Sequence, residues 1–397
     1  MKRFLQLIAS RLQAFEQFVV SIIYDRDTKD SRSVWCLKKA LLGVSYIFSG
    51  IVQCRYFLYE KRILKPQPLG CRVIVVGNLT VGGTGKTPVV EMLAKALRDR
   101  GRSVAILSRG YKSKTEPLLK KIWRSISHGA VPPPKVVSDG NTLFLDSEEA
   151  GDEPYMLARN LPGVKVIVDK NRVKGGYYAI KKYKVDTLIL DDGFQYLPLK
   201  GWLNILLIDK TNPFGNGNLL PRGILREPIK HLKRASYVFI TKSDGIEDPQ
   251  LMATIQQYQP SLPLIECRHY PTAFKALDNS HGLSLNAMEG KAIAVLSGIA
   301  SPKSFEQFLE DRGAYIVHKK QFTDHHRFTD YELEAFVKEA LDAKASYLLM
   351  TEKDAVRLPK NWSPPLPAYY LRIKIDILKG QDTFDGLVRK IADLPLS

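Results

Sequence analysis

The stretch VGNLTVGGTGKTP, residues 76–88, follows an apolar run and leads into a segment with helical periodicity. Glycines in such a turn let backbone N–H groups converge on phosphate oxygens, and the new helix directs its positive end at the same anion. Lys86 would neutralise the β- and γ-phosphates of a nucleotide, and the Thr87 hydroxyl would bind Mg²⁺. The stretch therefore predicts the phosphate loop of a P-loop phosphotransferase. The residues expected to bind the nucleotide are Thr80, Val81, Gly82, Gly83, Thr84, Gly85, Lys86 and Thr87.

One position departs from the usual pattern G-x-x-x-x-G-K-T, because Thr80 takes the place of the first glycine. A glycine turn that merely joins a strand to a helix is the alternative interpretation. The apolar run, the glycines, the Lys-Thr pair and the helical segment all agree with a phosphate loop instead. No G-x-G-x-x-G pattern occurs at this turn, which excludes the dinucleotide-binding fingerprint.

An acidic partner for the phosphate loop follows the apolar run Val185–Leu190, where Asp191 and Asp192 are adjacent. Two neighbouring carboxylates repel each other unless a cation or a basic group lies between them. In P-loop proteins a carboxylate at the end of a neighbouring strand holds Mg²⁺, directly or through water. We therefore predict that this pair binds a metal ion, and a helix-capping role is the alternative.

Short apolar runs alternate with helical stretches beyond residue 66. This alternation predicts an α/β fold of the P-loop NTPase type, with a mostly parallel sheet flanked by helices. A second set of runs predicts a smaller second α/β lobe. The predicted domains are N-terminal helices at 1–65, a P-loop core at 66–240 and a C-terminal lobe at 241–397. The predicted strands are 72–76, 103–107, 164–168, 187–190, 203–208, 236–240, 292–296, 314–317, 347–351 and 368–373, and the predicted helices include 87–98, 304–312 and 331–342.

The chain is strongly basic, with a formal net charge of +18 over 397 residues. Such a charge favours acidic partners: nucleic acid, anionic lipid or a phosphorylated substrate. We find no aromatic and basic stripe and no known nucleic-acid module, so we expect no nucleic-acid partner. Four scattered cysteines without a C-x-x-C pair fit neither a disulfide framework nor a zinc site, which favours a reducing cytosol.

Two apolar helices are predicted at the N-terminus. From Phe4 to Tyr24 apolar residues recur every three or four positions, which is typical of an amphipathic helix. A second helix begins near Val34 and includes the uncharged run Ala40–Cys54. A bilayer-spanning helix needs about 20 such residues, and Arg55 ends the run early, so we expect insertion into a membrane interface rather than crossing. Burial of both helices against the core is the alternative.

A switch GTPase is the competing class of P-loop protein. The residues Thr241-Lys242-Ser243-Asp244 follow an apolar run and match the [NT]-K-x-D pattern of guanine recognition. The acidic element, however, reads Asp-Asp-Gly rather than Asp-x-x-Gly, and the phosphate loop has its glycines in other places. A four-residue match is a weak signal, and ATP turnover measured against GTP turnover would separate the two classes.

Several short motifs follow the phosphate loop in a fixed order. They are Leu107-Ser108-Arg109-Gly110-Tyr111, Gly151-Asp152-Glu153-Pro154, Arg172 with Lys174-Gly175-Gly176, Asp191-Asp192-Gly193-Phe194-Gln195, Leu220-Pro221-Arg222-Gly223 with Leu225-Arg226-Glu227-Pro228, and Asp324-His325. Together with the loop, and over residues 55–360, they resemble the tetraacyldisaccharide 4'-kinase family, the membrane-associated kinases of lipid A biosynthesis.

The resemblance implies a kinase with ATP and Mg²⁺ as cofactors. Its reaction would move the γ-phosphoryl group of ATP to the 4'-hydroxyl of a tetraacylated glucosamine disaccharide 1-phosphate, giving lipid IVA. The expected partners are this acylated substrate and an anionic membrane surface, at the cytoplasmic face of the inner membrane of a Gram-negative bacterium. The oligomeric state stays open. A membrane-associated nucleotide switch that transfers no phosphate to lipid is the alternative.

By resemblance, Asp152 and His325 together accept the proton of the sugar hydroxyl, and Lys86 completes the predicted catalytic set. From the residues alone, Asp152 could instead cap the helix that begins near Pro154. His325 could be an exposed histidine in a polar stretch, and His326 beside it makes the assignment ambiguous.

Basic residues follow predicted strands or lie in glycine-rich turns, where an α/β protein exposes its ligand-binding edge. Guanidinium groups suit phosphate because their donors engage it in pairs. A solvated surface position is the default interpretation for any one of them. The predicted substrate-binding residues are Arg109, Arg172, Lys174, Arg222 and Arg226, and the predicted metal-binding residues are Thr87, Asp191, Asp192, Gln195 and Glu227.

Two details depart from the family pattern. Tyr196 stands where histidine is expected after Asp-Asp-Gly-Phe-Gln, and Gly201-Trp202 stands where Arg-Asp is expected. Any role of that histidine is therefore not carried over to this chain. The first 30 residues also exceed the family pattern.

Overall fold

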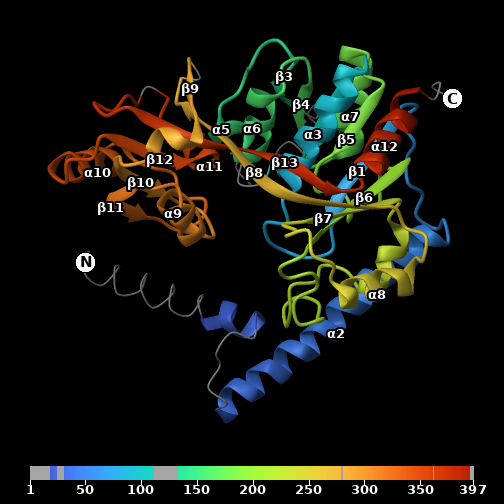
Figure 1. The fold of residues 1–397 in the computed structure, drawn as a ribbon. Coiled ribbons are helices and arrows are strands. Elements are labelled where there is room, and N and C mark those ends of the chain that lie inside the picture. Colours follow the sequence, from blue (N-terminus) through green and yellow to red (C-terminus); the bar gives the residue numbers. More distant parts are fainter. Residues whose placement is uncertain (1–17, 25–30, 111–131, 279, 361, 394–397) are drawn as a thin grey trace. The chain divides into compact units, whose positions relative to one another are not determined.

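The computed structural model describes residues 18–24, 31–110, 132–278, 280–360 and 362–393 (Figure 1). Its contacts divide the chain into two compact units. Unit 1 comprises residues 1–86, 187–268 and 377–397, and unit 2 comprises residues 87–186 and 269–376. The domain boundaries predicted after residues 65 and 240 stay a prediction, because compactness does not measure independent folding.

A parallel sheet forms the centre of unit 1. Strand β1 (Arg72–Asn78) is buried along its whole length and pairs with β5 (Thr187–Leu190) on one side and β6 (Leu203–Asp209) on the other. Strand β6 also pairs with β7 (Tyr237–Thr241), and β7 pairs with the start of β8 (Leu264–Ala276). Because all these pairings are parallel, the loops after β1, β5 and β7 emerge at one edge of the sheet.

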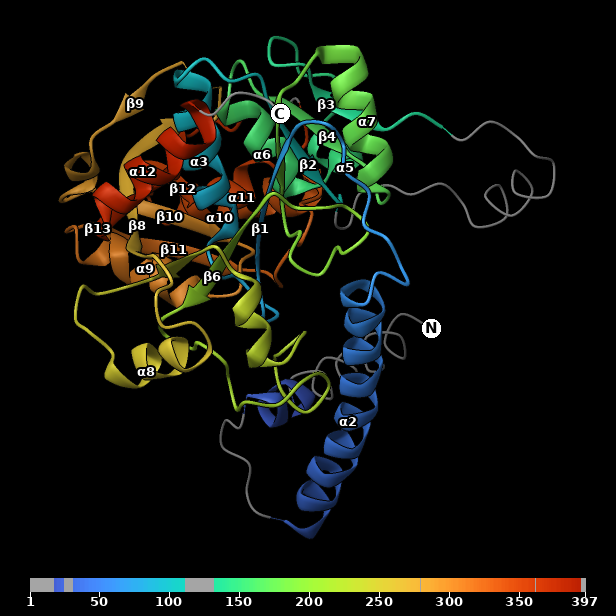
Figure 2. The ribbon, with the colours of Figure 1, turned by 90° about the vertical axis from the view of Figure 1, so that its right-hand side faces the viewer.

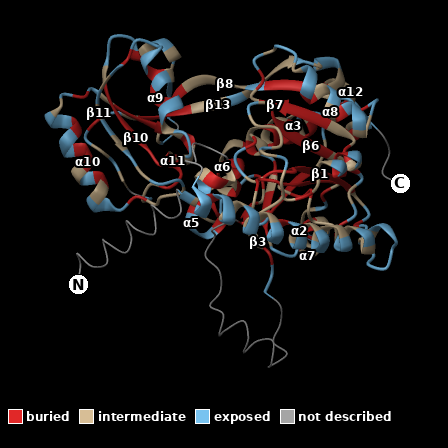
Figure 3. Cartoon of the chain, turned by 90° about the horizontal axis from the view of Figure 1, so that it is seen from below, coloured by how far each residue is buried: buried red, intermediate tan, exposed pale blue. Residues whose placement is uncertain are grey.

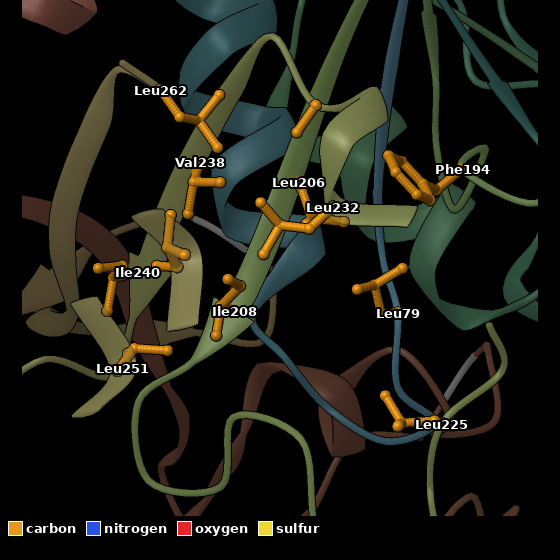
Figure 4. Close-up of a cluster of buried hydrophobic side chains, with 12 residues drawn as sticks. Leu79, Phe194, Leu206, Ile208, Leu225, Leu232, Val238, Ile240, Leu251 and Leu262 are labelled. Atoms are coloured by element: carbon orange, nitrogen blue, oxygen red, sulfur yellow. The ribbon is translucent and has the colours of Figure 1, made fainter. Parts of the chain in front are cut away.

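Buried apolar side chains hold helices against this sheet. Figure 4 shows side chains of β6 and β7, among them Leu206 and Val238, gathered with Leu232 of the 3₁₀ helix η1 (Ile229–Arg234) and Leu251 of α8 (Pro249–Tyr258). Helix α12 (Gln381–Asp393) buries one apolar face in the same unit. The apolar runs from which these strands were predicted thus form the buried core of unit 1.

Helix α2 (Arg32–Glu60) is the longest element of unit 1 and runs as a single rod (Figure 2). Ser31 caps its start, since the Ser31 hydroxyl accepts a hydrogen bond from the Val34 N–H. Among the described residues, α2 alone is long and apolar enough to cross a membrane, judged by length and composition only. The helix predicted from Phe4 falls largely outside the described residues, of which 18–23 are helical.

Unit 2 contains two groups of strands. In the first, β2 (Val104–Ser108) pairs in parallel with β4 (Lys165–Val168), and β3 (Lys135–Ser138) adds antiparallel to β4. The helices of this group are α3 (Lys86–Asp99), whose first residue belongs to unit 1, α5 (Ser147–Ala150), α6 (Asp152–Asn160) and α7 (Arg172–Tyr183).

The second group has β10 (Ala292–Ser297) between β11 (Tyr315–Gln321) and β12 (Tyr347–Thr351), with β13 (Ala368–Lys379) beyond β12, all parallel. A short strand, β9 (Gly282–Leu283), pairs antiparallel with β8. Its helices are η2 (Leu285–Met288), α9 (Pro302–Glu310), α10 (Asp330–Asp342) and α11 (Glu352–Ala355). In Figure 3 strands are coloured largely as buried, while helices expose one face, as the α/β prediction requires.

The main departures from the predicted elements are long, half-exposed strands. Strand β8 was not predicted, because its sequence contains a proline and several charged residues. Strand β13 continues past the predicted end at Ile373 to Lys379, with alternating polar residues. An apolar-run criterion finds strands buried on both faces and misses those with a solvated face.

Candidate functional site

The phosphate loop lies between the end of β1 and the start of α3. Gly82 and Gly85 have φ of 111° and 79°, a region that glycine adopts without strain. The Val81 N–H donates to the Ile224 carbonyl at 2.7 Å, and the buried Thr241 hydroxyl donates to the Thr84 carbonyl at 2.8 Å. Hydrogen bonds to other residues of unit 1 therefore hold the loop at both Val81 and Thr84.

The backbone at Thr80 shows why threonine can replace the usual glycine. Its φ is not positive, so no glycine is required at this position. Its carbonyl and hydroxyl oxygens accept from the Asn78 side-chain amide at 2.7 and 3.2 Å. Thr84 is also buried, and its hydroxyl has no hydrogen-bond partner within the described part of the chain. A buried hydroxyl in that state suits a loop built to meet a polar ligand.

A cluster of opposite charges follows the loop. Lys86 Nζ lies 3.1 Å from Asn78 Oδ1 and 3.5 Å from Asp192 Oδ1. Arg226 Nη1 donates to both oxygens of Asp192, at 3.0 and 2.9 Å. The Gln195 amide donates to the Asn78 carbonyl at 2.9 Å. The structure thus brings together four residues predicted from sequence and one that was missed, Asn78, whose only signal was its place at a strand end inside the loop motif.

The paired aspartates lie directly after β5. Asp191 is buried, while Asp192 is one-third exposed and has a φ of 51°. Within the described residues no group of three or more His, Cys, Asp or Glu side chains is arranged to hold a metal ion. A Mg²⁺ ion that is shared with nucleotide phosphates needs only one or two carboxylates from the protein, so the donor set fits that mode of binding.

Glu227 takes part in a buried ion-pair network. Its Oε2 accepts from Arg234 Nη1 at 2.6 Å and lies 2.7 Å from His231 Nδ1. Burial lowers the pKa of Arg234 from its ordinary value, and the charge of Glu227 opposes that shift. The Arg234 guanidinium also packs over the Phe194 ring at 4.2 Å. This network fixes the segment that carries Arg226.

The other predicted basic residues are divided between the units. In unit 1, Arg222 Nη1 donates to the Ile22 carbonyl at 3.1 Å. In unit 2, Lys174 Nζ lies 2.6 Å from Asp169 Oδ2. Arg172 is buried at the first turn of α7, whereas Arg109 is exposed directly after β2.

A second cluster of functional groups surrounds Asp152 in unit 2. Gly151, with a φ of 95°, is the residue that precedes α6, and no side chain caps this helix. The capping alternative for Asp152 is therefore wrong. Asp152 Oδ2 lies 3.2 Å from His325 Nδ1. His326 instead pairs with Glu332 Oε2 at 3.0 Å and stacks on Phe322, so His325 is the histidine that faces Asp152.

Two arginines that were not predicted hold the same carboxylate. Arg327 Nη2 donates to Asp152 Oδ1 at 3.0 Å, and Arg357 Nε donates to Asp152 Oδ2 at 2.8 Å. Burial would raise the pKa of Asp152, but the hydrogen bond with His325 and the charges of Arg357 and Arg327 outweigh it and leave the pKa below its ordinary value. Asp152 is therefore ionised at neutral pH.

No local signal could have found these arginines. Arg357 follows α11 and is 205 positions from Asp152 in the sequence. The residues around Arg357 contain no motif that indicates a functional site. The contact of α11 with α6 within unit 2 brings Arg357 to the start of α6.

The chain is similar to known proteins over most of its length. The family model for tetraacyldisaccharide-1-P 4'-kinase matches residues 37–392. The tetraacyldisaccharide 4'-kinase of Anaeromyxobacter dehalogenans (strain 2CP-C) is 38% identical over 347 residues, which are 85% of this chain and 86% of that protein. The corresponding protein of Syntrophus aciditrophicus (strain SB) is 36% identical over 377 residues, 92% of this chain and 95% of that one.

A solved structure gives the same result. LpxK from Aquifex aeolicus, crystallised in complex with ATP, aligns with a TM-score of 0.70 and 30% identity, covering 89% of this chain and 99% of that one. The family match spans most of the chain and includes both clusters. This chain therefore belongs to the tetraacyldisaccharide-1-P 4'-kinase family.

Proposed function

We propose that this chain transfers the γ-phosphoryl group of ATP to the 4'-hydroxyl of a tetraacylated glucosamine disaccharide 1-phosphate, giving lipid IVA. Family membership supports the reaction, and the relative that was crystallised with ATP supports the donor. The observation that carries the proposal is the contact of Lys86 with Asp192 beside a phosphate loop at the carboxyl edge of a parallel sheet. Phosphoryl transfer requires such placed charges more than covalent chemistry.

The nucleotide phosphates would lie in the loop of residues 80–87. Backbone N–H groups of the glycines would bind the phosphate oxygens, and Lys86 would exchange Asp192 for the β- and γ-phosphates. Asp191, Asp192, Gln195 and the Thr87 hydroxyl are the oxygen ligands proposed for Mg²⁺, and Glu227 is a further candidate. When bound, Mg²⁺ neutralises charge on the phosphates of ATP. Arg226 forms an ion pair with Asp192, so it can balance the negative charge of that carboxylate when Lys86 moves to the phosphates.

The acceptor hydroxyl would lose its proton to the pair formed by Asp152 and His325. We assign the proton to Asp152, because its carboxylate is ionised and so has electrons available. A weakly basic carboxylate suits kinases, since the hydroxyl becomes acidic only as its bond to phosphorus forms. The residues proposed to bind the acidic parts of the substrate are Arg109, Arg172, Lys174, Arg222 and Arg226.

The acylated substrate calls for a membrane surface, and α2 has the composition to lie on one. Large apolar side chains of α2 are exposed, including Trp35, Tyr46, Ile47 and Ile51. Lysines such as Lys39 lie near them, and cationic side chains favour anionic lipid. We propose that α2 attaches the protein to the cytoplasmic face of the inner membrane as a peripheral helix.

Incubation of the purified protein with labelled ATP and the tetraacylated disaccharide in detergent tests the reaction. Labelled lipid that depends on the protein is expected. ATP hydrolysis by folded protein without labelled lipid would overturn the proposal and leave the nucleotide switch. The family match does not favour that alternative, and parallel reactions with GTP test the Thr241 to Asp244 pattern.

A further inference from the structure

The segment from Thr241 to Asp244, which matches a guanine-recognition pattern, lies beside the phosphate loop within unit 1. Thr241 ends β7 and pairs in register with Asp209 at the end of β6, and β6 lies next to β1. The buried Thr241 hydroxyl donates to the Thr84 carbonyl at 2.8 Å. Three residues span at most about 10 Å, so Asp244 stays within reach of the sugar and base of a nucleotide whose phosphates occupy the phosphate loop.

Several contacts hold this segment in a strained conformation. Lys242 has a φ of 53°, which is uncommon for a residue other than glycine, and its Nζ lies 2.5 Å from Asp209 Oδ2. The Ser243 N–H donates to the Cys267 carbonyl at 3.0 Å, and the Ser243 hydroxyl donates to the buried Glu266 carboxylate at 2.8 Å. Backbone strain persists only where the surroundings fix it, and it clusters at ligand-binding sites. The segment is therefore built more rigidly than a surface turn requires.

Asp244 presents a carboxylate at the end of this rigid segment. Its side chain is 61% exposed and forms an ion pair with Lys210, the residue after β6. The Ile246 N–H donates to Oδ1 at 3.1 Å and Lys210 contacts the same oxygen, so within the described residues Oδ2 keeps its lone pairs for a ligand. The hydrogen bonds from Lys210 and from the Ile246 N–H lower the pKa of Asp244 from its ordinary value. At neutral pH this carboxylate is therefore ionised and can only accept hydrogen bonds.

A group that only accepts hydrogen bonds distinguishes the two purines by their edges. The N1–H and the 2-amino group of guanine are adjacent donors, and they match the two oxygens of a carboxylate. Adenine offers one donor, its 6-amino group, beside the lone pair of N1, which a carboxylate repels. A carboxylate at Asp244 therefore forms a hydrogen bond to guanine that adenine cannot form.

We propose that Asp244 reads the nucleotide base and that GTP is a second phosphoryl donor for this kinase. The inference rests on the proposed function, because it uses the same phosphate loop and the same lipid acceptor. GTP and ATP carry identical triphosphates, so the phosphate loop binds either one. The bond from the γ-phosphorus to the bridging oxygen breaks and GDP leaves with its electron pair. A bond to the 4'-oxygen forms, and the hydroxyl proton passes to the pair formed by Asp152 and His325.

The test gives the full-length protein γ-labelled ATP or γ-labelled GTP with the tetraacylated disaccharide in detergent. We expect labelled lipid from both donors, with similar kcat values, because contacts to the base are the same in the ground state and the transition state. Label on the lipid, rather than free phosphate, separates a kinase that uses GTP from a switch GTPase. In Asp244→Asn we expect the KM for GTP to rise about 10- to 100-fold, the usual discrimination of a bidentate base contact. The KM for ATP should not rise, because the amide oxygen still accepts from the 6-amino group.

Xanthosine triphosphate gives a second readout, in which the variant gains a substrate. Xanthine keeps the N1–H of guanine but has an oxygen in place of the 2-amino group. An asparagine amide has both an acceptor and a donor, so it matches xanthine where a carboxylate does not. We expect Asp244→Asn to have a lower KM for this nucleotide than the wild type. Asp248→Asn is the matched control, because Asp248 caps α8 through the N–H groups of Gln250 and Leu251, and asparagine caps equally well.

Labelled lipid from ATP but not from GTP in the wild type overturns this inference and leaves the proposed function intact. So does an Asp244→Asn variant with an unchanged KM for GTP, or a rise in that KM that Asp248→Asn shares. If neither donor labels lipid, the proposed function fails. Calorimetric titration of the three nucleotides then decides the role of Asp244 without turnover, and equal GTP affinity in the wild type and Asp244→Asn overturns it.

Discussion

Asp192 and Asp152 are each held by basic side chains, but the consequences differ. Asp192 is partly exposed and contacts Lys86 and Arg226, so incoming phosphates can take over its cations. Asp152 is mostly buried, and Arg357 behind it is wholly buried, so removal of either partner leaves a charge in a medium that solvates it poorly. The first carboxylate can therefore exchange partners during turnover, while the second keeps its arginine partners.

Lys86→Ala should abolish turnover. The substitution removes the only side-chain cation of the phosphate loop, which stabilises charge that develops on the transferred group. We expect kcat to fall at least about 10²-fold, measured with labelled ATP and lipid acceptor. Lys182→Ala is the control, because the contacts of Lys182 within the described residues are with two tyrosines of α7. Equal loss in both variants would contradict the role given to Lys86.

Asp152→Asn should reduce kcat about 10²- to 10⁴-fold, the usual contribution of a general base, with little change in the KM for ATP. The amide keeps the shape of the side chain but cannot take the proton. Asp139→Asn, at an exposed turn of the same unit, should leave kcat unchanged. Near wild-type rates for Asp152→Asn would place the base elsewhere.

The same substitution should destabilise unit 2 in a pH-dependent way. A pKa below the ordinary value means that ionised Asp152 contributes stability above its unfolded pKa and loses it as pH falls through the folded pKa. We expect Asp152→Asn to lower the free energy of unfolding by about 3–5 kcal/mol near neutral pH, because Arg357 loses its partner. Urea denaturation should show this difference shrink below roughly pH 4. A difference that is constant with pH would mean that the ion pairs contribute little.

At the scale of elements, the site depends on the close approach of one loop to β1. The Gly193 N–H donates to the Val76 carbonyl at 2.9 Å, and Phe194 packs against Gly77. A Cβ on Gly77 would lie 2.7 Å from Phe194 Cβ, closer than real Cβ contacts. Gly77 therefore allows the loop that follows the paired aspartates to approach β1 closely.

Gly77→Ala should consequently disturb both stability and nucleotide affinity. We expect about 1–3 kcal/mol of destabilisation from overpacking, and a higher KM for ATP because the loop that carries Asp191 and Asp192 shifts. Gly386→Ala on α12 is the control, since a Cβ added there would meet no described atom within 4 Å beyond the backbone of its own helix. That variant should be as stable as the wild type or more so, by up to about 1 kcal/mol. Differential scanning calorimetry and ATP titration measure the two effects.

Local patterns predicted the elements that carry the nucleotide chemistry. The phosphate loop, β5 and β12 follow from contiguous residues, and the predicted bounds of the two strands equal the observed ones. Arg357 was missed because it contacts Asp152, which is 205 positions away in the sequence. Asn78 was missed because a buried amide at a strand end has many structural explanations. Sequence reasoning therefore found what lies on one segment and missed what distant segments form together.

At the scale of the whole chain, the net charge of +18 and the exposed apolar side chains of α2 suit the same surface. Anionic lipid attracts the charge, and the interfacial region accepts the apolar side chains. Ser45 ties the helix to unit 1, because its hydroxyl donates to the Leu219 carbonyl at 2.8 Å and accepts from the Arg222 N–H at 3.0 Å. Attachment of α2 to a membrane would therefore affect the position of the segment that carries Arg222 and Arg226, because Ser45 links that segment to α2.

Ile47→Glu with Ile51→Glu should weaken binding to anionic vesicles without unfolding the protein. Both isoleucines are more than 60% exposed on α2, so the folded protein loses little, whereas two charges cannot enter the acyl region. Burial of an isoleucine side chain contributes about 1.5–3 kcal/mol, so we expect binding to fall at least about 10-fold in co-sedimentation. Ile246→Glu is the control, because Ile246 is 69% exposed but lies outside α2. Equal binding by the double variant and the control, with wild-type thermal stability in both, would mean that α2 does not reach the membrane.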